Sequence, residues 1–545
     1  MNSGSTKQIP LRQTGAFSEL VMDYLQGANG FRTRFTTAPD LDSVLRVAQT
    51  QATPDPQLRQ QLGRRVAECY SQLQNPRIDP AQLQRVGQTN TRFVVTAHQP
   101  VLLGGPLYIL YKLGSVVSLA RQLNEHPQAN GLHFIPLYWV GDEDHDQEEI
   151  GQCHVLGNKI TWNPGGSGAM GRRVIENPEE FLTPLQEALG NRSEAGRWMA
   201  CARDCYRRGI SLFEATLRWT DTLFGSQGLV VFSGDDPVLK QAAMPIWENE
   251  IRQRTSADGA RRGGELLQTM GYHAQITPRE VNLFWLDAHS RDRLVRTPEG
   301  TWQAGALQWN DEEELLHQLR DAPQCISPNV VLRPVYQEWL LQSVAFVGGP
   351  AEVAYWLQLY PVFQQLNVSF PPVFMRASVL LMDAGMQHRW QQSGLNEADL
   401  FAGRDEWVRG FLQQQPGGVV SETEVLASMQ TSFTRLAEEA AMVDPSLRAW
   451  VLAEFTKVGK SVETIAHRVR KAQKQQHETG INRLLQLHRR LFPDDQLQER
   501  QDNFLSWAAS DPCDELLEFC RRQLPFPSED LFLLNLTGLP TAKEA

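Results

Sequence analysis

The chain has 545 residues and a formal net charge of −11 at pH 7, and such an excess of negative charge argues against a general nucleic-acid binder. Its seven cysteines form no CxxC pair, which argues against a disulfide framework or a zinc site built on paired cysteines. No uncharged run approaches the roughly 18 residues of a membrane span, and the polar stretch Met1–Leu20 lacks the apolar core of a signal peptide, so we expect a cytoplasmic protein that binds neither nucleic acid nor membranes.

Residues 1–90 are rich in Gln and Arg, are interrupted by prolines, and are predicted to be mainly helical. Two apolar runs follow, Phe93–Ala97 and Phe134–Val140, and between them Pro106–Asn124 carries apolar residues at helical spacing. A strand, a helix and a strand in this order form a βαβ unit, whose strands are parallel and whose crossover is right-handed. The pattern therefore predicts an α/β fold with a parallel sheet.

Strand-like runs recur as far as residue 385, which predicts one α/β core over residues 91–385. Further runs of this kind are Gly228–Phe232, Val281–Leu286, Ser343–Val347 and Val373–Ser378. Helical insertions are expected between the strands, at about 160–225 and 240–330.

A change of period from about residue 420 marks a helical region, predicted over residues 386–510. Apolar residues from Leu426 to Val443 and from Phe455 to Ala472 alternate at spacings of three and four. Asp444 and Pro445 lie between the two stretches and are expected to be the N-cap and first residue of the second helix. About two heptads per helix leave two interpretations open: helices that pack on their own domain, or a projecting hairpin that pairs with itself or with a second subunit. Residues 511–545 are predicted to return to the core.

Polar clusters follow the first two predicted strands, in Thr96–Pro100 and Trp139–Asp146. The carboxyl ends of parallel strands are where open α/β sheets bind ligands. Carboxylates beside an imidazole can hold an ammonium group, bind Mg²⁺ or act as a general base. The alternatives are a solvated acidic loop that caps a helix and a histidine satisfied within the core.

Two Gly-Gly-Pro turns, Gly104–Tyr108 and Gly348–Glu352, each lie between a strand and a helix. Glycine lets a ligand approach the backbone, and free N–H groups at a helix start attract phosphate or carboxylate. A tight turn that binds nothing is the other interpretation. Arg333 and Arg376 lie in apolar surroundings, where an arginine needs an anion, either a structural carboxylate or an anionic substrate.

Taken together, these segments closely resemble the BshC family, to which a cysteine-ligase role in bacillithiol biosynthesis is attributed. The resemblance rests on Thr96–Pro100, Gly105–Tyr108 with Lys112, Trp139–Asp146, Ser327–Asn329, Leu332–Glu338, Gly348–Trp356, Leu491–Pro493 and Leu497–Arg500. It implies a Rossmann-like core with connecting-peptide insertions, like those of class I aminoacyl-tRNA synthetases, and a helical coiled coil that supports a homodimer. It further implies that cysteine is added to the amine of glucosaminyl-malate, with ATP (or bound ADP) at the site and Mg²⁺ as a further candidate.

The resemblance and the strand-end pattern together give a set of candidate site residues. The candidate catalytic residues are His98, Asp142, Glu143, Asp144 and His145. The candidate binding residues are Gln99, Gly105, Pro106, Tyr108, Lys112, Arg333, Gln337, Gly348, Gly349, Glu352, Tyr355 and Arg376. No metal ligand is assigned. Two other functions are considered: a metal-dependent amidohydrolase or transferase that uses the acidic cluster, and a non-catalytic scaffold that binds small molecules.

Overall fold

The computed structural model describes residues 6–35, 38–415 and 422–537. The chain forms two compact units, one of residues 1–381 and 497–545 and the other of Met382–Gln496. In the described part of the chain, no helix is long and apolar enough to cross a membrane. The polar start, Met1–Ser5, and the point near residue 420 where the period changes lie outside the described residues.

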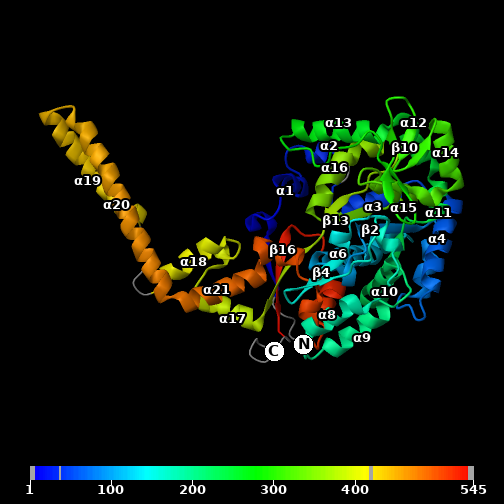
Figure 1. Ribbon diagram of the computed structural model, residues 1–545, viewed down its shortest axis with the longest axis horizontal. Helices are drawn as coiled ribbons and strands as arrows, with labels where there is room; N and C mark the ends of the chain where they lie inside the picture. Colours follow the sequence, from blue (N-terminus) through cyan, green and yellow to red (C-terminus); the bar gives the residue numbers. More distant parts are fainter. Residues whose placement is uncertain (1–5, 36–37, 416–421, 538–545) are drawn as a thin grey trace. The chain divides into compact units, whose positions relative to one another are not determined.

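A five-stranded, all-parallel sheet forms the centre of the first unit, in the order β14-β13-β2-β3-β6 (Figure 1). Its strands are β2 (Thr91–His98), β3 (His133–Val140), β6 (Val230–Ser233), β13 (Ala345–Gly348) and β14 (Val373–Met375). The strands are almost wholly buried, as parallel strands covered on both faces must be. This confirms the predicted α/β class. The chain runs outward from β2 to β6 and then returns to β13 on the other side of β2, so the strand order reverses between β2 and β13.

Helices pack on this sheet and connect its strands. The crossover helix α6 (Leu107–Glu125) joins β2 to β3, and α15 (Leu332–Leu341) and α16 (Pro350–Gln365) flank β13 in the chain. Helix α13 (Thr255–Thr269) packs closely on α16, where a Cβ on Gly263 would lie 1.7 Å from the carbonyl oxygen of Gln358. Glycine is required at this crossing because any side chain would push the two helices apart.

The two insertions differ in structure. The first follows the small hairpin of β4 (Gln152–Val155) and β5 (Asn158–Thr161) and is helical, as expected, with α8 (Glu179–Leu189), α9 (Ala195–Cys205) and α10 (Leu212–Phe224). The second is not wholly helical, which corrects the prediction. Besides α12 (Met244–Gln253), α13 and α14 (Glu312–Asp321) it contains β7 (Leu283–Leu286), β8 (Arg291–Arg293), β9 (Val295–Arg296), β10 (Trp302–Ala304), β11 (Leu307–Trp309) and β12 (Ile326–Pro328). The predicted strand at 281–286 pairs antiparallel with β8 and β12 and lies outside the parallel sheet.

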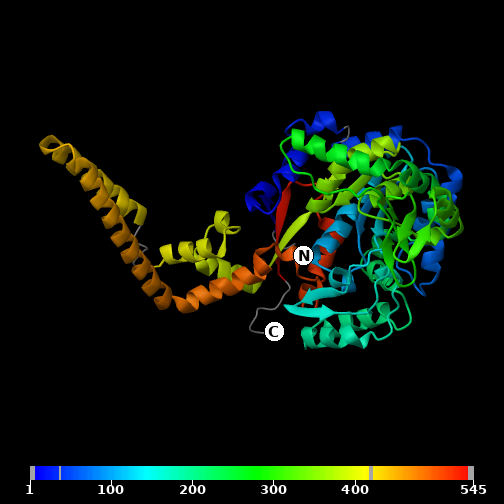
Figure 2. The ribbon, with the colours of Figure 1, turned by 45° about the horizontal axis from the view of Figure 1, so that its top comes forward.

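The N-terminal segment is mainly helical but begins with a strand. Its helices are α1 (Glu19–Gln26), α2 (Phe31–Arg34), α3 (Leu41–Thr50), α4 (Pro56–Ser71) and α5 (Pro80–Val86). Strand β1 (Thr6–Pro10) pairs antiparallel with β16 (Asp530–Leu536), which also pairs with β15 (Ser378–Asp383) (Figure 2). The sequence did not indicate β1, because its residues are mostly polar and exposed and its partner lies more than 500 residues away.

The second unit is helical, with α17 (Ala384–Ser393), α18 (Arg404–Gln413), α19 (Glu422–Val443), α20 (Leu447–Gln476) and α21 (Glu478–Leu491). Helices α19 and α20 lie side by side as a hairpin (Figure 1), with the rings of Phe433 and Phe455 in contact at 5.2 Å between centroids. Helix α20 begins at Leu447, two residues after Pro445. The Asp444 carboxylate nevertheless accepts the N–H of Ser446 at 2.9 Å, which is the bond expected of an N-cap residue.

The second unit also ends earlier than the predicted residue 510. Residues from Leu497 belong to the first unit, since the Gln498 and Glu499 side chains are buried and accept backbone N–H groups of β15.

Candidate active site

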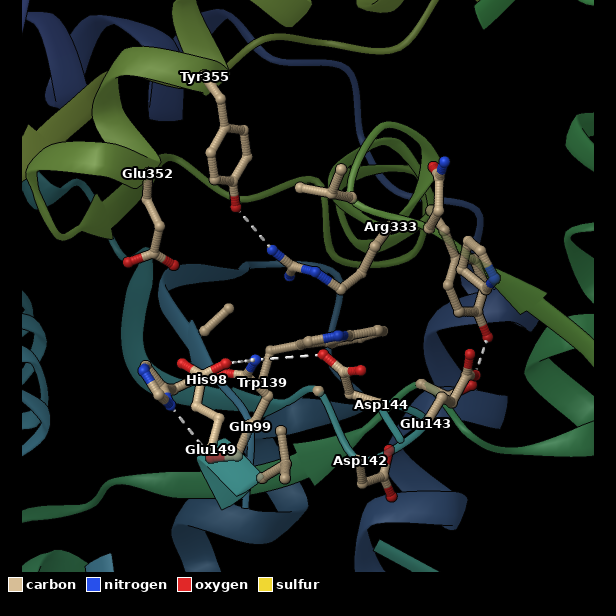
Figure 3. A pocket seen from close by; sticks show the side chains of 18 of the residues that line it. His98, Gln99, Trp139, Asp142, Glu143, Asp144, Glu149, Arg333, Glu352 and Tyr355 are labelled. Atoms are coloured by element: carbon tan, nitrogen blue, oxygen red, sulfur yellow. Dashed lines mark hydrogen bonds between the residues drawn. The ribbon is translucent and has the colours of Figure 1, made fainter. Parts of the chain in front are cut away.

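A cavity of about 650 Å³ lies at the carboxyl edge of the parallel sheet (Figure 3). Its lining comes from the ends of β2 and β3, the start of α16, helix α15 and the second insertion. It therefore lies beside the point where the strand order reverses, as expected for this class of sheet. Twelve predicted residues line it: His98, Gln99, Tyr108, Lys112, Asp142, Glu143, Asp144, Arg333, Gly349, Glu352, Tyr355 and Arg376.

The other five predicted residues do not line the cavity: Gly105, Pro106, His145, Gln337 and Gly348. The His145 side chain is 45% exposed, and its Nδ1 lies 3.3 Å from Nη1 of Arg291. Gln337 is fully buried behind Arg333 on α15. Gly348 ends β13, and its carbonyl accepts the N–H of Arg376.

The first Gly-Gly-Pro turn is packed against protein, so the predicted anion contact there is wrong. The side-chain amide of Asn503 donates to the carbonyl of Gly105 at 2.7 Å. The N–H of Leu107, at the start of α6, donates to the carbonyl of Asp502 at 2.7 Å. This turn needs glycine for close packing, since a Cβ on Gly104 would lie 2.8 Å from Nε1 of Trp219.

The second Gly-Gly-Pro turn binds a carboxylate of the chain itself. Glu352 accepts the N–H of Gly349 at 2.8 Å and forms an ion pair with Lys112, which also donates to the carbonyl of Ala97 at 3.0 Å. Burial is the largest influence on the pKa of Glu352 and would raise it, but the Lys112 ammonium, His98 and the N–H of Gly349 together lower that pKa. The start of α16 is thus capped, and the ion pair with Lys112 neutralises the Glu352 charge at the cavity wall.

His98 is a neutral hydrogen-bonding group. Its Nε2 lies 3.1 Å from the Tyr108 hydroxyl and its Nδ1 3.3 Å from the carbonyl of Gln99. Burial, aided by the Lys112 charge, lowers the pKa of His98 to about 3, and burial raises the pKa of Tyr108 to about 12. An imidazole with so low a pKa is a weak base at neutral pH, so His98 is suited to orienting a substrate group.

The acidic cluster divides into two pairs of carboxylates. Asp142 accepts a hydrogen bond from Ser233, and Glu143 forms an ion pair with the fully buried Lys240 at 2.8 Å. Asp144 and Glu149 instead share the Gln99 amide, at 3.2 and 3.4 Å. The first pair is engaged within the protein. In the second pair, Asp144 also accepts the N–H of His145 at 2.8 Å and lies 3.7 Å from Arg291, while the Glu149 carboxylate accepts only from Gln99 among the described residues.

Further charged side chains surround Asp142 and Glu143. Lys240 also pairs with Asp235 at 2.7 Å, and Arg172 reaches the same carboxylate through two bonds of 2.6 Å. Burial raises the pKa of Asp142 well above its usual range, and the charges of Asp235 and Glu143 add to this effect. No three His, Cys, Asp or Glu residues of the described chain gather as a metal-binding group.

The sequence left two partners open for Arg333 and Arg376, a structural carboxylate or an anionic substrate. The structure separates the two residues in this respect. Arg376 forms a buried ion pair with Glu499 at 2.6 Å, a structural carboxylate. Arg333 donates to the Tyr355 hydroxyl at 3.0 Å and lies 3.5 Å from Oε1 of Gln337. In the described chain no carboxylate pairs with Arg333, whose side chain extends over the cavity in Figure 3. Arg333 is therefore the better candidate for binding an anionic substrate group.

Several lining residues were not predicted from the sequence: Glu149, Asp235, Arg279, Arg291, Arg293 and Arg500. Glu149 continues the acidic run of Trp139–Asp146, and that proximity was the available signal. The arginines at 279, 291 and 293 come from the second insertion, about 150 residues after the acidic cluster, so no local spacing could have indicated them. Arg291 stacks on Phe284, with its guanidinium carbon 4.1 Å from the ring centroid, and lies 3.7 Å from Asp144.

A buried carboxyl behind Arg333 leads to a prediction about stability. Burial raises the pKa of Glu338 to about 7 from an ordinary value of 4.5. The folded chain then holds this proton more tightly than the unfolded chain does, so the free energy of unfolding falls as pH rises from about 4.5 to about 7. We expect Glu338→Gln to flatten this dependence and to raise stability at pH 8 by up to roughly 3 kcal/mol. Urea denaturation at pH 5 and pH 8 measures the free energy of unfolding, and Glu187→Gln, at an exposed position, serves as the control. An unchanged pH dependence in Glu338→Gln would contradict the raised pKa of Glu338.

Comparison with known proteins shows the family to which this chain is similar. The family model described as "Bacillithiol biosynthesis BshC, N-terminal Rossmann-like domain" matches residues 5–377, and the BshC "C-terminal coiled-coil domain" matches residues 379–514. Two relatives named "Putative cysteine ligase BshC" are similar over nearly their whole length. That of Flavobacterium johnsoniae is 32% identical over 92% of this chain and 94% of its own. The relative from Cytophaga hutchinsonii is 30% identical over 94% of this chain and 95% of its own length.

Proposed function

This chain belongs to the BshC family of bacillithiol biosynthesis, and from that premise we propose that it is a ligase that joins cysteine to the amine of glucosaminyl-malate. The proposed reaction forms an amide, with ATP activating the cysteine carboxylate. We further propose that the enzyme is cytoplasmic and that its helical hairpin supports a homodimer. Large apolar side chains exposed on that hairpin are consistent with such a contact: Leu436, Trp450 and Ile465 are 50%, 60% and 62% exposed.

The division of charge across the cavity supports this proposal most strongly. Arg333, without a carboxylate partner in the described chain, lies across the cavity from the carboxylates of Asp144 and Glu149, which the Gln99 amide bridges (Figure 3). An amide-forming ligase must bind anionic carboxylates and an amine in one place, and it needs charges of both signs to do so. In this model Arg333 holds a substrate carboxylate, and Asp144 and Glu149 hold the ammonium group of the amine substrate.

The amine must lose a proton before it can attack a carboxyl carbon. Glu149 is suited to accept that proton, because burial, followed by the charges of Asp146 and Asp144, raises its pKa and so makes it a stronger base. Gln99 bridges Glu149 and Asp144 and keeps both carboxylates turned toward the amine. His98 and Tyr108, both neutral at pH 7, orient the acceptor group without adding charge.

The donors of the cavity fit a phosphate group. Arg333, Arg279 and Arg293 line the cavity. Arginine suits phosphate because its planar donors match the phosphate oxygens. A Mg²⁺ ion that accompanies ATP would be held mainly by phosphate oxygens and water, which leaves Asp144 and Glu149 to the amine. ATP bound there would supply the leaving group that the cysteine carboxylate lacks.

Turnover with purified components tests the proposal. The protein is incubated with glucosaminyl-malate, cysteine, Mg²⁺ and ATP, and bacillithiol and the nucleotide product are identified by mass spectrometry. Bacillithiol with AMP would support activation as an adenylate, and bacillithiol with ADP would support an acyl phosphate. A folded protein that binds these substrates and forms no product would contradict the ligase proposal and favour a scaffold.

The dimer is tested separately by light scattering on the purified full chain. We expect a mass near twice 61.6 kDa and a shift toward monomer when Trp450 and Ile465 are replaced by Glu. A monomeric parent protein at micromolar concentration would contradict this part of the proposal.

A further inference from the structure

Arg291, on β8, is anchored within the second insertion. Its Nε donates to Oγ of Ser327 at 2.9 Å, and its Nη2 donates to the carbonyl of Pro328 at 3.0 Å. Its guanidinium stacks on the ring of Phe284, with the guanidinium carbon 4.1 Å from the ring centroid. Ser327 and Pro328 belong to β12 and Phe284 to β7, and both strands form one antiparallel sheet with β8. The insertion therefore fixes the position of this guanidinium.

The remaining nitrogen of Arg291 contacts the acidic loop that follows β3. Nη1 lies 3.3 Å from Nδ1 of His145 and 3.7 Å from Oδ1 of Asp144. The Arg291 side chain is only 8% exposed, and the N–H groups of a guanidinium can donate but cannot accept. Nδ1 of His145 must therefore be the acceptor, which places the proton of the neutral imidazole on Nε2.

This contact bears on the side chain of Asp144 and not on the backbone of the loop. The first insertion holds the backbone, because the N–H of Met170 donates to the carbonyl of Asp144 at 2.7 Å. In the carboxylate, Oδ2 accepts from Gln99 at 3.2 Å (Figure 3), while Oδ1 accepts the N–H of His145 at 2.8 Å and faces Arg291. The direction of this carboxylate in the cavity thus depends on the end of β2 on one side and on the second insertion on the other.

We propose that Arg291 is a positioning residue, which joins the second insertion to His145 and directs the Asp144 carboxylate toward the ammonium group of the amine substrate. His145, a candidate catalytic residue in the sequence, then serves as the acceptor of Arg291 and not as a base. The task given to Asp144 rests on the proposed ligase function, whereas the contact between Arg291 and His145 does not.

Positioning and simple electrostatics predict opposite effects when Arg291 is removed. A guanidinium beside Asp144 repels a second cation, so its charge alone would weaken the binding of an ammonium group. If charge were all that mattered, removing Arg291 would strengthen amine binding. If Arg291 positions the carboxylate, its removal weakens amine binding, because a carboxylate free to turn must be ordered each time the amine binds.

Nitrogen NMR of the full chain, labelled with ¹⁵N in histidine, tests the contact without any substrate. At pH 8 we expect His145 to show a single tautomer with its proton on Nε2, in a signal that is assigned by its loss in His145→Asn. Arg291→Met keeps the packing on Phe284 but has no donor, so it should show a mixture of both tautomers. Arg296→Met, at an exposed position on β9, is the matched control and should leave the signal unchanged. A single unchanged tautomer in Arg291→Met would overturn the contact.

Calorimetry tests the positioning role with two ligands, glucosaminyl-malate and its N-acetylated form, which has no ammonium group. We expect Arg291→Met to weaken glucosaminyl-malate binding about tenfold and to leave binding of the acetylated form unchanged, while Arg291→Lys recovers part of the loss. His145→Leu removes the acceptor at an exposed position, where folding is not at risk, and should weaken binding of the amine alone by a smaller factor.

Two results would overturn the positioning role. Equal weakening for both ligands would show that Arg291 only maintains the structure, and tighter binding of the amine in Arg291→Met would show that it acts only as a repelling charge. A parent protein that does not bind glucosaminyl-malate would refute the proposed function and this role of Asp144 together, while the tautomer of His145 would still decide the contact with Arg291.

Discussion

Replacing Arg333 with Ala is expected to lower kcat/KM for bacillithiol formation by a factor on the order of 10²–10³ while the protein stays folded. A charge-assisted contact to a substrate carboxylate or phosphate contributes roughly 3–4 kcal/mol to transition-state binding in a water-poor cavity. Folding should not suffer, because Arg333 forms no ion pair within the described chain and only two hydrogen bonds, to Tyr355 and Gln337. Steady-state kinetics and circular dichroism on the same preparations measure both quantities.

Two further variants make this prediction specific. Arg333→Lys keeps the positive charge but loses the planar pair of donors, so it should recover part of the lost activity and no more. Tyr355→Phe removes the hydroxyl that accepts from Arg333 and should cost less than tenfold, since it affects only the position of the guanidinium. Full activity in Arg333→Ala would contradict this assignment and point to another arginine of the cavity, such as Arg279.

The position of the site followed from sequence because it depends on local patterns. Apolar runs gave β2 and β3, and the polar residues that follow such runs must meet at one edge of a parallel sheet. His98 and Asp144 were found in this way, and both line the cavity.

Which of these charged groups remains available could not be predicted. That depends on partners distant in the chain: Lys240 engages Glu143 from 97 positions away and Glu499 engages Arg376 from 123. Arg333 and Arg376 look alike in the sequence, and only the fold shows that one of them meets a buried carboxylate. Likewise the first Gly-Gly-Pro turn satisfies the rule for an anion site, but Asp502 and Asn503 cover it from nearly 400 positions later.

The second large expected effect is a loss of stability when the buried ion pair of Arg376 and Glu499 is broken. Arg376 and Glu499 are 3% and 2% exposed, and the second carboxylate oxygen of Glu499 accepts the hydroxyl of Ser378 at 2.9 Å and the N–H of Val379 at 3.2 Å. Glu499→Ala would leave a buried guanidinium unpaired and orphan both of these donors. Removing one partner of a buried pair costs about 3–5 kcal/mol, so we expect a loss of this size in urea denaturation of the first unit.

The double variant Arg376→Met/Glu499→Leu distinguishes an ion pair from simple packing. Apolar replacement of both partners removes the uncompensated charge as well as the attraction, so the double variant should be more stable than Glu499→Ala, although the donors of Ser378 and Val379 stay unsatisfied. Additive losses would instead mean that the two side chains stabilise the fold independently. Because β15 carries both of those donors and pairs with β16, hydrogen exchange in Glu499→Ala should rise first along these two strands. Loss of protection confined to the helices of Met382–Gln496 would contradict the structural role given to this pair.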